Sequence, residues 1–293
     1  MASSSSDLRA EWSDLLGRRP AFAEPLAVYG AVLELWDDWA ATRGPVLDWP
    51  AEACRAQWQR RAPLLADPAA LSVRPADVED LVGNVMETLA PVVPEQAAGL
   101  QRFAEAWDAG ALGLAALLPR PGRIGDGTAE RLSGLPSGLV AFLAYACLRP
   151  ALERYFEGCR PHLDDDAWSL GACPFCGGPA GFADLVDNGA RRLACHLCAG
   201  RWPFARLQCV FCGTDSTSDL IRLAPEQNPR EEGYAVAGCT RCRGYLKELD
   251  RRVRWNGAGP LVEDWGSPHL DLIAAREGYW RAVPSLVQLA PSD

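Results

Sequence analysis

The chain is poor in the residues that acid–base enzymes and nucleic-acid-binding proteins rely on. Of its 293 residues three are histidine and one, Lys247, is lysine, and the formal net charge is −9. Three histidines leave little material for general acid–base catalysis, and no Ser-His-Asp order, P-loop or dinucleotide-binding glycine motif stands out. A net negative chain has no gross electrostatic attraction for nucleic acid or for an anionic membrane surface. The composition therefore argues against an enzyme and against a nucleic-acid-binding protein.

Long hydrophobic runs are missing as well. The longest, from about Gly138 to Leu148, is far short of the ~18 apolar residues that indicate a membrane-spanning helix. The N-terminal residues lack the charged start and the apolar stretch of a secretory signal. We therefore expect a cytoplasmic protein without membrane insertion. In such a reducing compartment cysteines serve as metal ligands more often than as a disulfide framework.

Cysteine, in contrast, is abundant and paired. Eight of the 11 cysteines form four Cys-x-x-Cys pairs in the C-terminal half, namely Cys173/Cys176, Cys195/Cys198, Cys209/Cys212 and Cys239/Cys242. Two cysteines at this spacing can turn toward one point, and two such pairs supply the four ligands of a tetrahedral site. Eight ligands therefore predict two metal ions. The remaining cysteines lie in helical contexts, where buried cysteine acts as a small apolar residue; they are Cys54, Cys147 and Cys159.

The pairs also repeat. The first and third end in glycine directly after the second cysteine, where glycine allows a positive φ, whereas the second and fourth end in Cys-x-Gly. In the first unit 18 residues separate the two pairs, and in the second unit 26. This repeat favours sequential pairing, and interleaved pairing, as in cross-braced domains, is the alternative. The sequential ligand sets are Cys173, Cys176, Cys195 and Cys198, and Cys209, Cys212, Cys239 and Cys242.

This spacing is typical of rubredoxin-like or zinc-ribbon modules, in which a hairpin closes a four-sulfur site. Such a site has no open coordination position for metal catalysis, and its ligands suit zinc or iron without separating them. His196 lies between two cysteines and could replace one, but complete cysteine quartets disfavour that role. Each site could do nothing more than hold together a module too small to bury a useful core.

The N-terminal half has helical periodicity instead. Leu26, Tyr29, Leu33 and Trp36 lie on one helical face. Helices are expected over Phe22–Ala41, Ala51–Leu65, Ala76–Leu89, Glu95–Ala109 and Ser137–Cys159, the last kinked or divided at Pro150. Hairpins are expected around Asp187-Asn-Gly189 and between Leu220–Leu223 and Tyr234–Ala237, and a further helix over Leu270–Ala282.

The fold class predicted is α+β, an N-terminal all-helical domain followed by two tandem rubredoxin-like modules. The predicted boundaries are 1–168 for the helical domain, 169–208 and 209–256 for the two modules, and 257–293 for a C-terminal extension with a helix packing back on the body.

The cysteine segment resembles the formate dehydrogenase accessory protein family, FdhE. The resemblance rests on Cys173-Pro-Phe-Cys-Gly, Leu193-Ala-Cys-His-Leu-Cys198 with Trp202, Cys209-Val-Phe-Cys-Gly and Cys239-Thr-Arg-Cys-Arg-Gly-Tyr-Leu-Lys247. Glu263-Asp264 and His269-Leu-Asp271 also fit the family's C-terminal pattern.

The resemblance implies a cytoplasmic, non-catalytic maturation factor that acts on the catalytic subunit of respiratory formate dehydrogenase. It also implies that the eight paired cysteines hold two metal ions, with iron favoured and zinc possible. No client-binding residue and no oligomeric state follows from it.

Four other classes compete with this interpretation. A nucleic-acid-binding zinc ribbon is disfavoured, because residues 171–256 hold twelve basic and nine acidic residues, a balance of only +3. A cysteine-rich Hsp40-type module would need a second glycine after each pair, which is missing in all four. A thiol–disulfide oxidoreductase would need an exposed Cys-x-x-Cys at a helix N-terminus. An iron-based redox protein acting on the client stays open.

Overall fold

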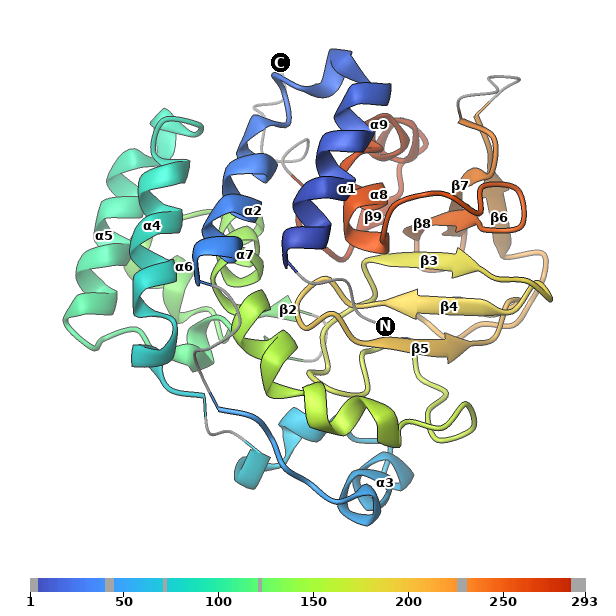
Figure 1. Ribbon diagram of the computed structural model, residues 1–293, viewed down its shortest axis with the longest axis horizontal. Helices are drawn as coiled ribbons and strands as arrows, with labels where there is room; N and C mark the ends of the chain where they lie inside the picture. Colours follow the sequence, from blue (N-terminus) through green and yellow to red (C-terminus); the bar gives the residue numbers. More distant parts are fainter. Residues whose placement is uncertain (1–4, 40–44, 71–72, 121–122, 226–230, 286–293) are drawn as a thin grey trace.

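Helices fill one side of the molecule and a mixed sheet fills the other (Figure 1). The structure is a computed structural model that describes residues 5–39, 45–70, 73–120, 123–225 and 231–285. The helical side contains α1 (Ser5–Arg18), α2 (Ala27–Trp39), α3 (Ala51–Gln59), α4 (Glu79–Leu89), α5 (Ala97–Asp108), α6 (Thr128–Ser133) and α7 (Ser137–Tyr155). A two-stranded ribbon, β1 (Pro119–Arg120) with β2 (Arg123–Ile124), precedes α6, and a 3-10 helix, Glu157–His162, follows α7.

The helices form where the sequence periodicity predicts them. In α4 the buried side chains are Leu81, Val82, Val85, Met86 and Leu89, which form one apolar face, and acidic residues occupy the first turn, where the helix dipole favours them. The predicted ends are too long by a few residues, and residues 40 and 41 of the first predicted helix lie outside the described residues. Helix α1 has no counterpart among the stretches predicted.

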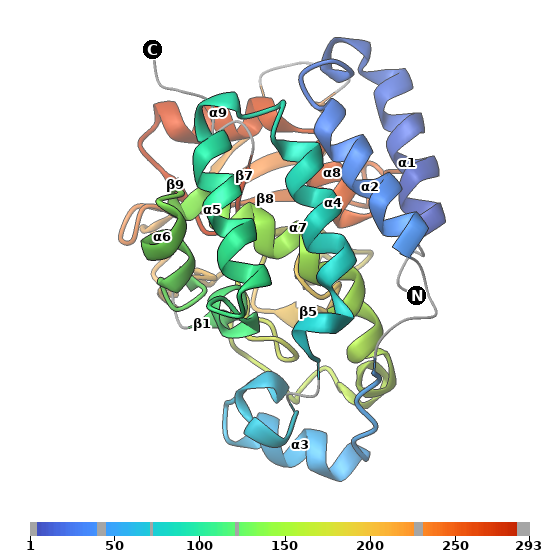
Figure 2. The same cartoon turned by 90° about the vertical axis from the view of Figure 1, so that its left-hand side faces the viewer.

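Helix α7 lies at the centre of the helical layer and is buried over most of its length (Figure 2). Pro150 does not divide this helix, because α7 is continuous from Ser137 to Tyr155, and a kink at Pro150 stays a prediction. Proline removes one hydrogen bond from the helix, and packing on several sides compensates for that loss.

The sheet unites the two cysteine modules. Its seven strands are β3 (Phe182–Leu185), β4 (Arg191–Ala194), β5 (Arg201–Phe204), β6 (Leu220–Leu223), β7 (Tyr234–Cys239), β8 (Gly244–Asp250) and β9 (Trp280–Arg281). Strands β3 to β5 form one antiparallel unit and β6 to β8 another, so both predicted hairpins are present. The two units join through parallel pairing of β3 with β8, with Ala183 opposite Glu248.

The C-terminal segment covers the sheet and reaches the helical layer. It contains α8 (Pro260–Trp265) and α9 (Pro268–Arg276), and residues 286–293 lie outside the described residues. Trp265 stacks on Tyr29 of α2 with ring centroids 4.2 Å apart and meets Trp12 of α1 edge to face. One cluster of buried side chains includes residues of the helices, of the first module and of α8. The predicted boundaries at 168, 208 and 256 stay a prediction.

The α+β class with an N-terminal helical region and two four-cysteine clusters is confirmed. Within the described part of the chain, no helix combines the length and the apolar character needed to cross a membrane.

Candidate metal centres

The structure brings the eight paired cysteines together in the two sequential groups. Their sulfur atoms lie within 4.8 Å of one another inside each group. We call the set Cys173, Cys176, Cys195 and Cys198 group 1, and the set Cys209, Cys212, Cys239 and Cys242 group 2. The closest Sγ–Sγ distances are 3.5 Å in group 1 and 3.6 and 3.8 Å in group 2. Four thiolates at ~2.3 Å from a metal ion lie about 3.8 Å apart in a tetrahedron, so both groups fit zinc or iron.

A positive φ follows the second cysteine of every pair. Gly177 and Gly213 have φ values of 79° and 73°, as the sequence predicts. Ala199 and Arg243 adopt the same conformation at 56° and 60°, although side chains disfavour it. This turn lets backbone amides point at sulfur, and the Gly178 amide lies 3.4 Å from Cys176 Sγ. The shared conformation indicates that closing the sulfur cage outweighs the local strain at the two non-glycine positions.

The glycines of the second and fourth pairs have a packing role. A Cβ atom at Gly200 would lie 2.6 Å from the ring of Phe175 and 3.1 Å from Cys173 Sγ. A Cβ atom at Gly244 would lie 2.6 Å from the ring of Phe211. Each phenylalanine comes from the opposite cysteine pair of its own group. Glycine is therefore required where the two pairs of a group meet.

The two groups differ in burial. All four cysteines of group 1 are buried, whereas in group 2 Cys212 is exposed and Cys242 is partly exposed. The four cysteines of group 1 belong to the same buried cluster as the side chains of the helical layer. Trp58 Nε1 donates a hydrogen bond to the Pro174 carbonyl at 3.0 Å.

Two arginines of the helical layer bind the second cysteine pair of group 1. Arg149 donates to the carbonyl of His196 at 2.6 Å, and Arg160 donates to the carbonyl of Cys198 at 2.7 Å. Both guanidinium groups also place positive charge beside a site that carries net negative charge when a divalent ion binds four thiolates. Group 2 has a smaller cover, in which Trp280 donates from Nε1 to the Cys242 carbonyl at 2.7 Å.

The ionisation of the thiols shows what a metal ion would supply. Burial raises the pKa of Cys173 and of Cys176, and it raises the pKa of Cys242 to about 12. Burial also acts against ionisation of Cys195, but hydrogen bonds from the other thiols of its group outweigh it and lower its pKa. Neighbouring thiols thus stabilise one thiolate at the expense of the others. A bound cation would allow the whole set to ionise, which is the chemistry of a metal-binding quartet.

His196 is not part of either group. Its ring packs against Gly181, and its Nε2 lies 3.1 Å from an Asp264 carboxylate oxygen. Burial lowers the pKa of His196, with the Asp264 carboxylate acting in the opposite direction. The His196 side chain therefore contacts Asp264 and is not a ligand in either group of sulfur atoms.

That network is the main feature that sequence reasoning missed. Lys247, 1 % exposed, donates to Asp264 and to Asp271 with nitrogen–oxygen distances of 3.0 and 2.9 Å. Arg281 of β9 pairs with the same two aspartates. The network joins β8, α8, α9 and β9. It gives the single lysine of the chain a structural role as a buried ion-pair partner. The only signal in the sequence was that both aspartates belong to the C-terminal pattern of the family it resembles.

The molecule is thus an α+β protein with two complete four-cysteine groups on one shared sheet. One group is buried, and the other is partly exposed to solvent. Its fold matches the crystal structure of the FdhE protein from Pseudomonas aeruginosa with a TM-score of 0.63, over 100% of this chain and 99% of that one, at 23% identity. No family model matches the chain.

Curated relatives carry the same family name. The chain is 36% identical over 173 residues to the "Protein FdhE homolog" of Pseudomonas putida, covering 56% of this chain and 52% of that protein. The homologue of Pseudomonas aeruginosa is 34% identical over 167 residues, covering 54% and 52%, and that of Aquifex aeolicus 28% over 152 residues, covering 50% and 51%. The chain spans about half the length of the curated relatives it matches. The chain is thus similar in sequence to about half of these FdhE homologues, and it shares its fold with the FdhE crystal structure.

Proposed function

We propose that this protein is a non-catalytic accessory factor in the maturation of respiratory formate dehydrogenase, which binds the immature catalytic subunit in the cytoplasm. The observation that carries the proposal is the presence of two closed four-cysteine groups on a fold shared with FdhE. Groups of four thiolates have no open position for a substrate, so they suit a structural or an electron-transfer role better than hydrolysis.

In this proposal the eight cysteines bind two metal ions and make the sheet a rigid platform. Structural four-thiolate sites contribute on the order of 10 kcal/mol to folding, because the ligands are brought together only in the folded chain. Group 1 would fix the sheet to the helical layer, since its backbone carbonyls accept hydrogen bonds from Trp58, Arg149 and Arg160. Without metal the sheet would lose its structure, and the surface that binds the catalytic subunit would be lost with it.

The test compares cysteine variants in metal content and in client binding. Cys195→Ser and Cys242→Ser are each expected to lose one metal equivalent and to bind the immature catalytic subunit more weakly in a co-purification assay. Cys147→Ala is the matched control, since Cys147 is buried in α7 and belongs to neither group. If the variants that have lost a metal equivalent bind the catalytic subunit as well as the wild type does, the platform proposal is refuted.

A second function, electron transfer to the client, is favoured by the exposure of group 2. Iron bound there would supply one-electron chemistry, and the exposed edge at Cys212 would give a partner access. The absorption spectrum and the metal content of anaerobically purified protein separate the two. Two equivalents of iron with thiolate-to-iron charge-transfer bands keep the redox role, and two equivalents of zinc refute it.

A further inference from the structure

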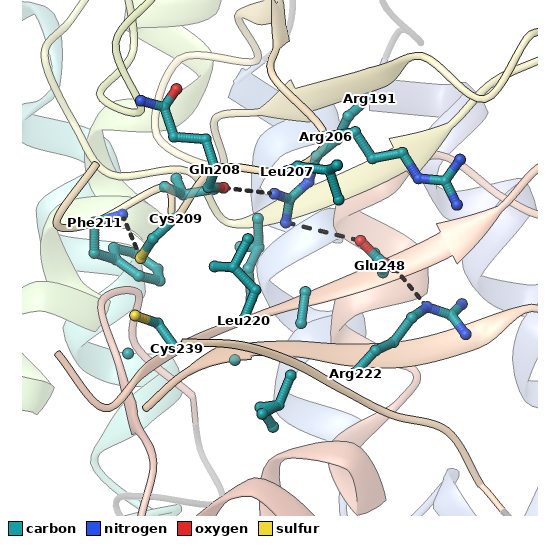
Figure 3. Close-up of a pocket in the computed structure, with 16 residues that line it drawn as sticks. Arg191, Arg206, Leu207, Gln208, Cys209, Phe211, Leu220, Arg222, Cys239 and Glu248 are labelled. Atoms are coloured by element: carbon teal, nitrogen blue, oxygen red, sulfur yellow. Dashed lines mark hydrogen bonds and ion pairs between the residues drawn. The ribbon is translucent and has the colours of Figure 1, made fainter. Parts of the chain in front are cut away.

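A pocket of about 220 Å³ lies between one face of the sheet and the segment 206–211 (Figure 3). The register explains its floor. Arg222 pairs with Ala237, which in turn pairs with Leu246, and side chains of paired residues lie on the same face of a sheet. Glu248, two residues further along β8, lies on that face too. Arg191 of β4 also lines the pocket, so strands of both modules contribute to it.

The pocket has two unlike ends. At one end Glu248 lies between Arg191 and Arg222, and at the other Cys209 and Cys239 of group 2 form part of the wall (Figure 3). With Arg206 the lining carries three arginines and one glutamate, a formal charge of +2. Four thiolates around a divalent ion carry a net charge of −2. An anionic ligand would therefore be attracted to the arginine end and repelled by the cysteine end.

Arg191 is a buried charge of the pocket with few close partners. It is 6% exposed, and its Nε has no hydrogen-bond partner among the described residues. Its Nη1 donates to the Gln208 carbonyl at a long 3.4 Å, and its Nη2 is 3.7 Å from Glu248. Glu248 instead accepts a short hydrogen bond from Arg222 Nε at 2.9 Å. A guanidinium group buried with so few partners is costly unless an acceptor completes its shell.

Apart from Gln208, the remainder of the lining is mostly apolar. Leu220 and Leu246 lie on the floor, and Leu207 on the rim is 63% exposed. The volume is below the ~300–1,000 Å³ usual for ligand sites, so a nucleotide-sized molecule is excluded. The geometry points to a site for a carboxylate on a short aliphatic chain, with the carboxylate toward Arg191 and Arg222 and the chain along the leucines. Neither four-cysteine group requires such a ligand.

Two sources supply this chemistry, a free short-chain acid or a glutamate side chain of a peptide. The probes are pentanoate and the peptide acetyl-Leu-Glu-Leu-amide, each titrated by NMR into the full-length, metal-loaded protein with Leu207 and Leu220 methyl groups as reporters. The neutral controls are pentanamide and acetyl-Leu-Gln-Leu-amide. We expect saturable binding of the charged probes and at least ~10-fold weaker binding of the neutral ones, because charge-assisted hydrogen bonds are lost.

The variant that tests the site is Arg222→Gln. The Arg222 side chain is 48% exposed, so its replacement should not unfold the chain. It should weaken binding of both charged probes ~10-fold or more. Arg192→Gln is the matched control, because Arg192 precedes Leu193 and follows Arg191 on β4 and so lies on the opposite face. Arg192→Gln should bind both charged probes as the wild type does.

Tighter binding of the peptide identifies a partner's acidic side chain as the ligand, and tighter binding of pentanoate identifies a free acid. The inference is overturned if neither charged probe saturates, if the neutral probes bind equally well, or if Arg222→Gln leaves binding unchanged. It is also overturned if Arg222→Gln alters only the metal affinity of group 2, since the arginines would then only balance the thiolate charge.

Discussion

The contact between Gly200 and Phe175 makes a sharp prediction about group 1. A Gly200→Ala variant would add a methyl group 2.6 Å from a ring carbon, where carbon atoms normally approach to about 3.5–4.0 Å. Phe175 cannot move away easily. It is 1% exposed and is held by Trp58 and Phe156, whose ring centroids lie 6.0 and 5.9 Å from its own. The strain must therefore pass to the cysteine pair or to the helical layer.

Inserting one carbon into a tightly packed site costs about 1–3 kcal/mol, and the fixed ring places this variant near the upper end of that range. For a chain of this size each kcal/mol lowers the melting temperature by roughly 2–4 °C, so a cost of about 2–3 kcal/mol predicts a decrease of about 4–12 °C. The same methyl group lies 3.1 Å from Cys173 Sγ. We therefore also expect faster release of one metal equivalent to a chromogenic chelator.

Two further glycines serve as controls in the same thermal-unfolding and metal-release assays. Gly244→Ala makes the equivalent contact with Phe211, which is only partly buried and can shift, so about 1 kcal/mol is expected. Gly83→Ala lies in α4 with nothing within 4 Å of the added atom and should stabilise the helix by about 0.5–1 kcal/mol. If Gly200→Ala unfolds and releases metal as the wild type does, the packing argument is wrong.

Three other predictions concern the metal groups and the buried network. A chelator should remove the metal of group 2 first, because Cys212 is exposed and all of group 1 is buried; equal release rates would contradict this. Lys247→Met should cost about 3–5 kcal/mol in urea unfolding, since Asp264 and Asp271 would lose a buried cation that they share with Arg281; a cost below about 1 kcal/mol would contradict it. Burial alone would raise the pKa of Asp264, but Arg281 and Lys247 outweigh it and hold that pKa well below its usual range. Because the pKa is depressed in the folded state, the stabilisation is complete above about pH 5 and is lost progressively as the pH falls through about 4, the pKa of an unfolded aspartate. The difference in unfolding free energy between wild type and Asp264→Asn should thus be constant from pH 7 to about 5 and narrow below pH 4, and a constant difference down to pH 3 would refute the assignment.

Local patterns in the sequence predicted the cysteine groups and most helices, because both depend on residues close together in the chain. Two cysteines three positions apart share one turn, and the repeated glycines pair the turns in order. The helical face of α4 follows in the same way from the spacing of Leu81, Val85 and Leu89. These features need no knowledge of distant contacts.

Local patterns failed where burial from several sides determines the outcome. Helix α7 continues through Pro150 because its neighbours compensate for the lost hydrogen bond. Strand β8 was not predicted, because it is buried along its whole length and lacks the alternation of a half-exposed strand. Positive φ at Ala199 and Arg243 follows from sulfur-cage closure, which the residue types themselves do not indicate.

The sequence by itself thus determined the two sets of four thiols, their order and the helical half, since each is encoded by spacing within a short segment. Only the tertiary structure decided that the modules share one sheet through β3 and β8, that the helical layer buries group 1 and leaves group 2 open, and that Lys247 holds the C-terminal helices to that sheet. These properties depend on which distant surfaces come into contact, and that is set by packing of the whole chain.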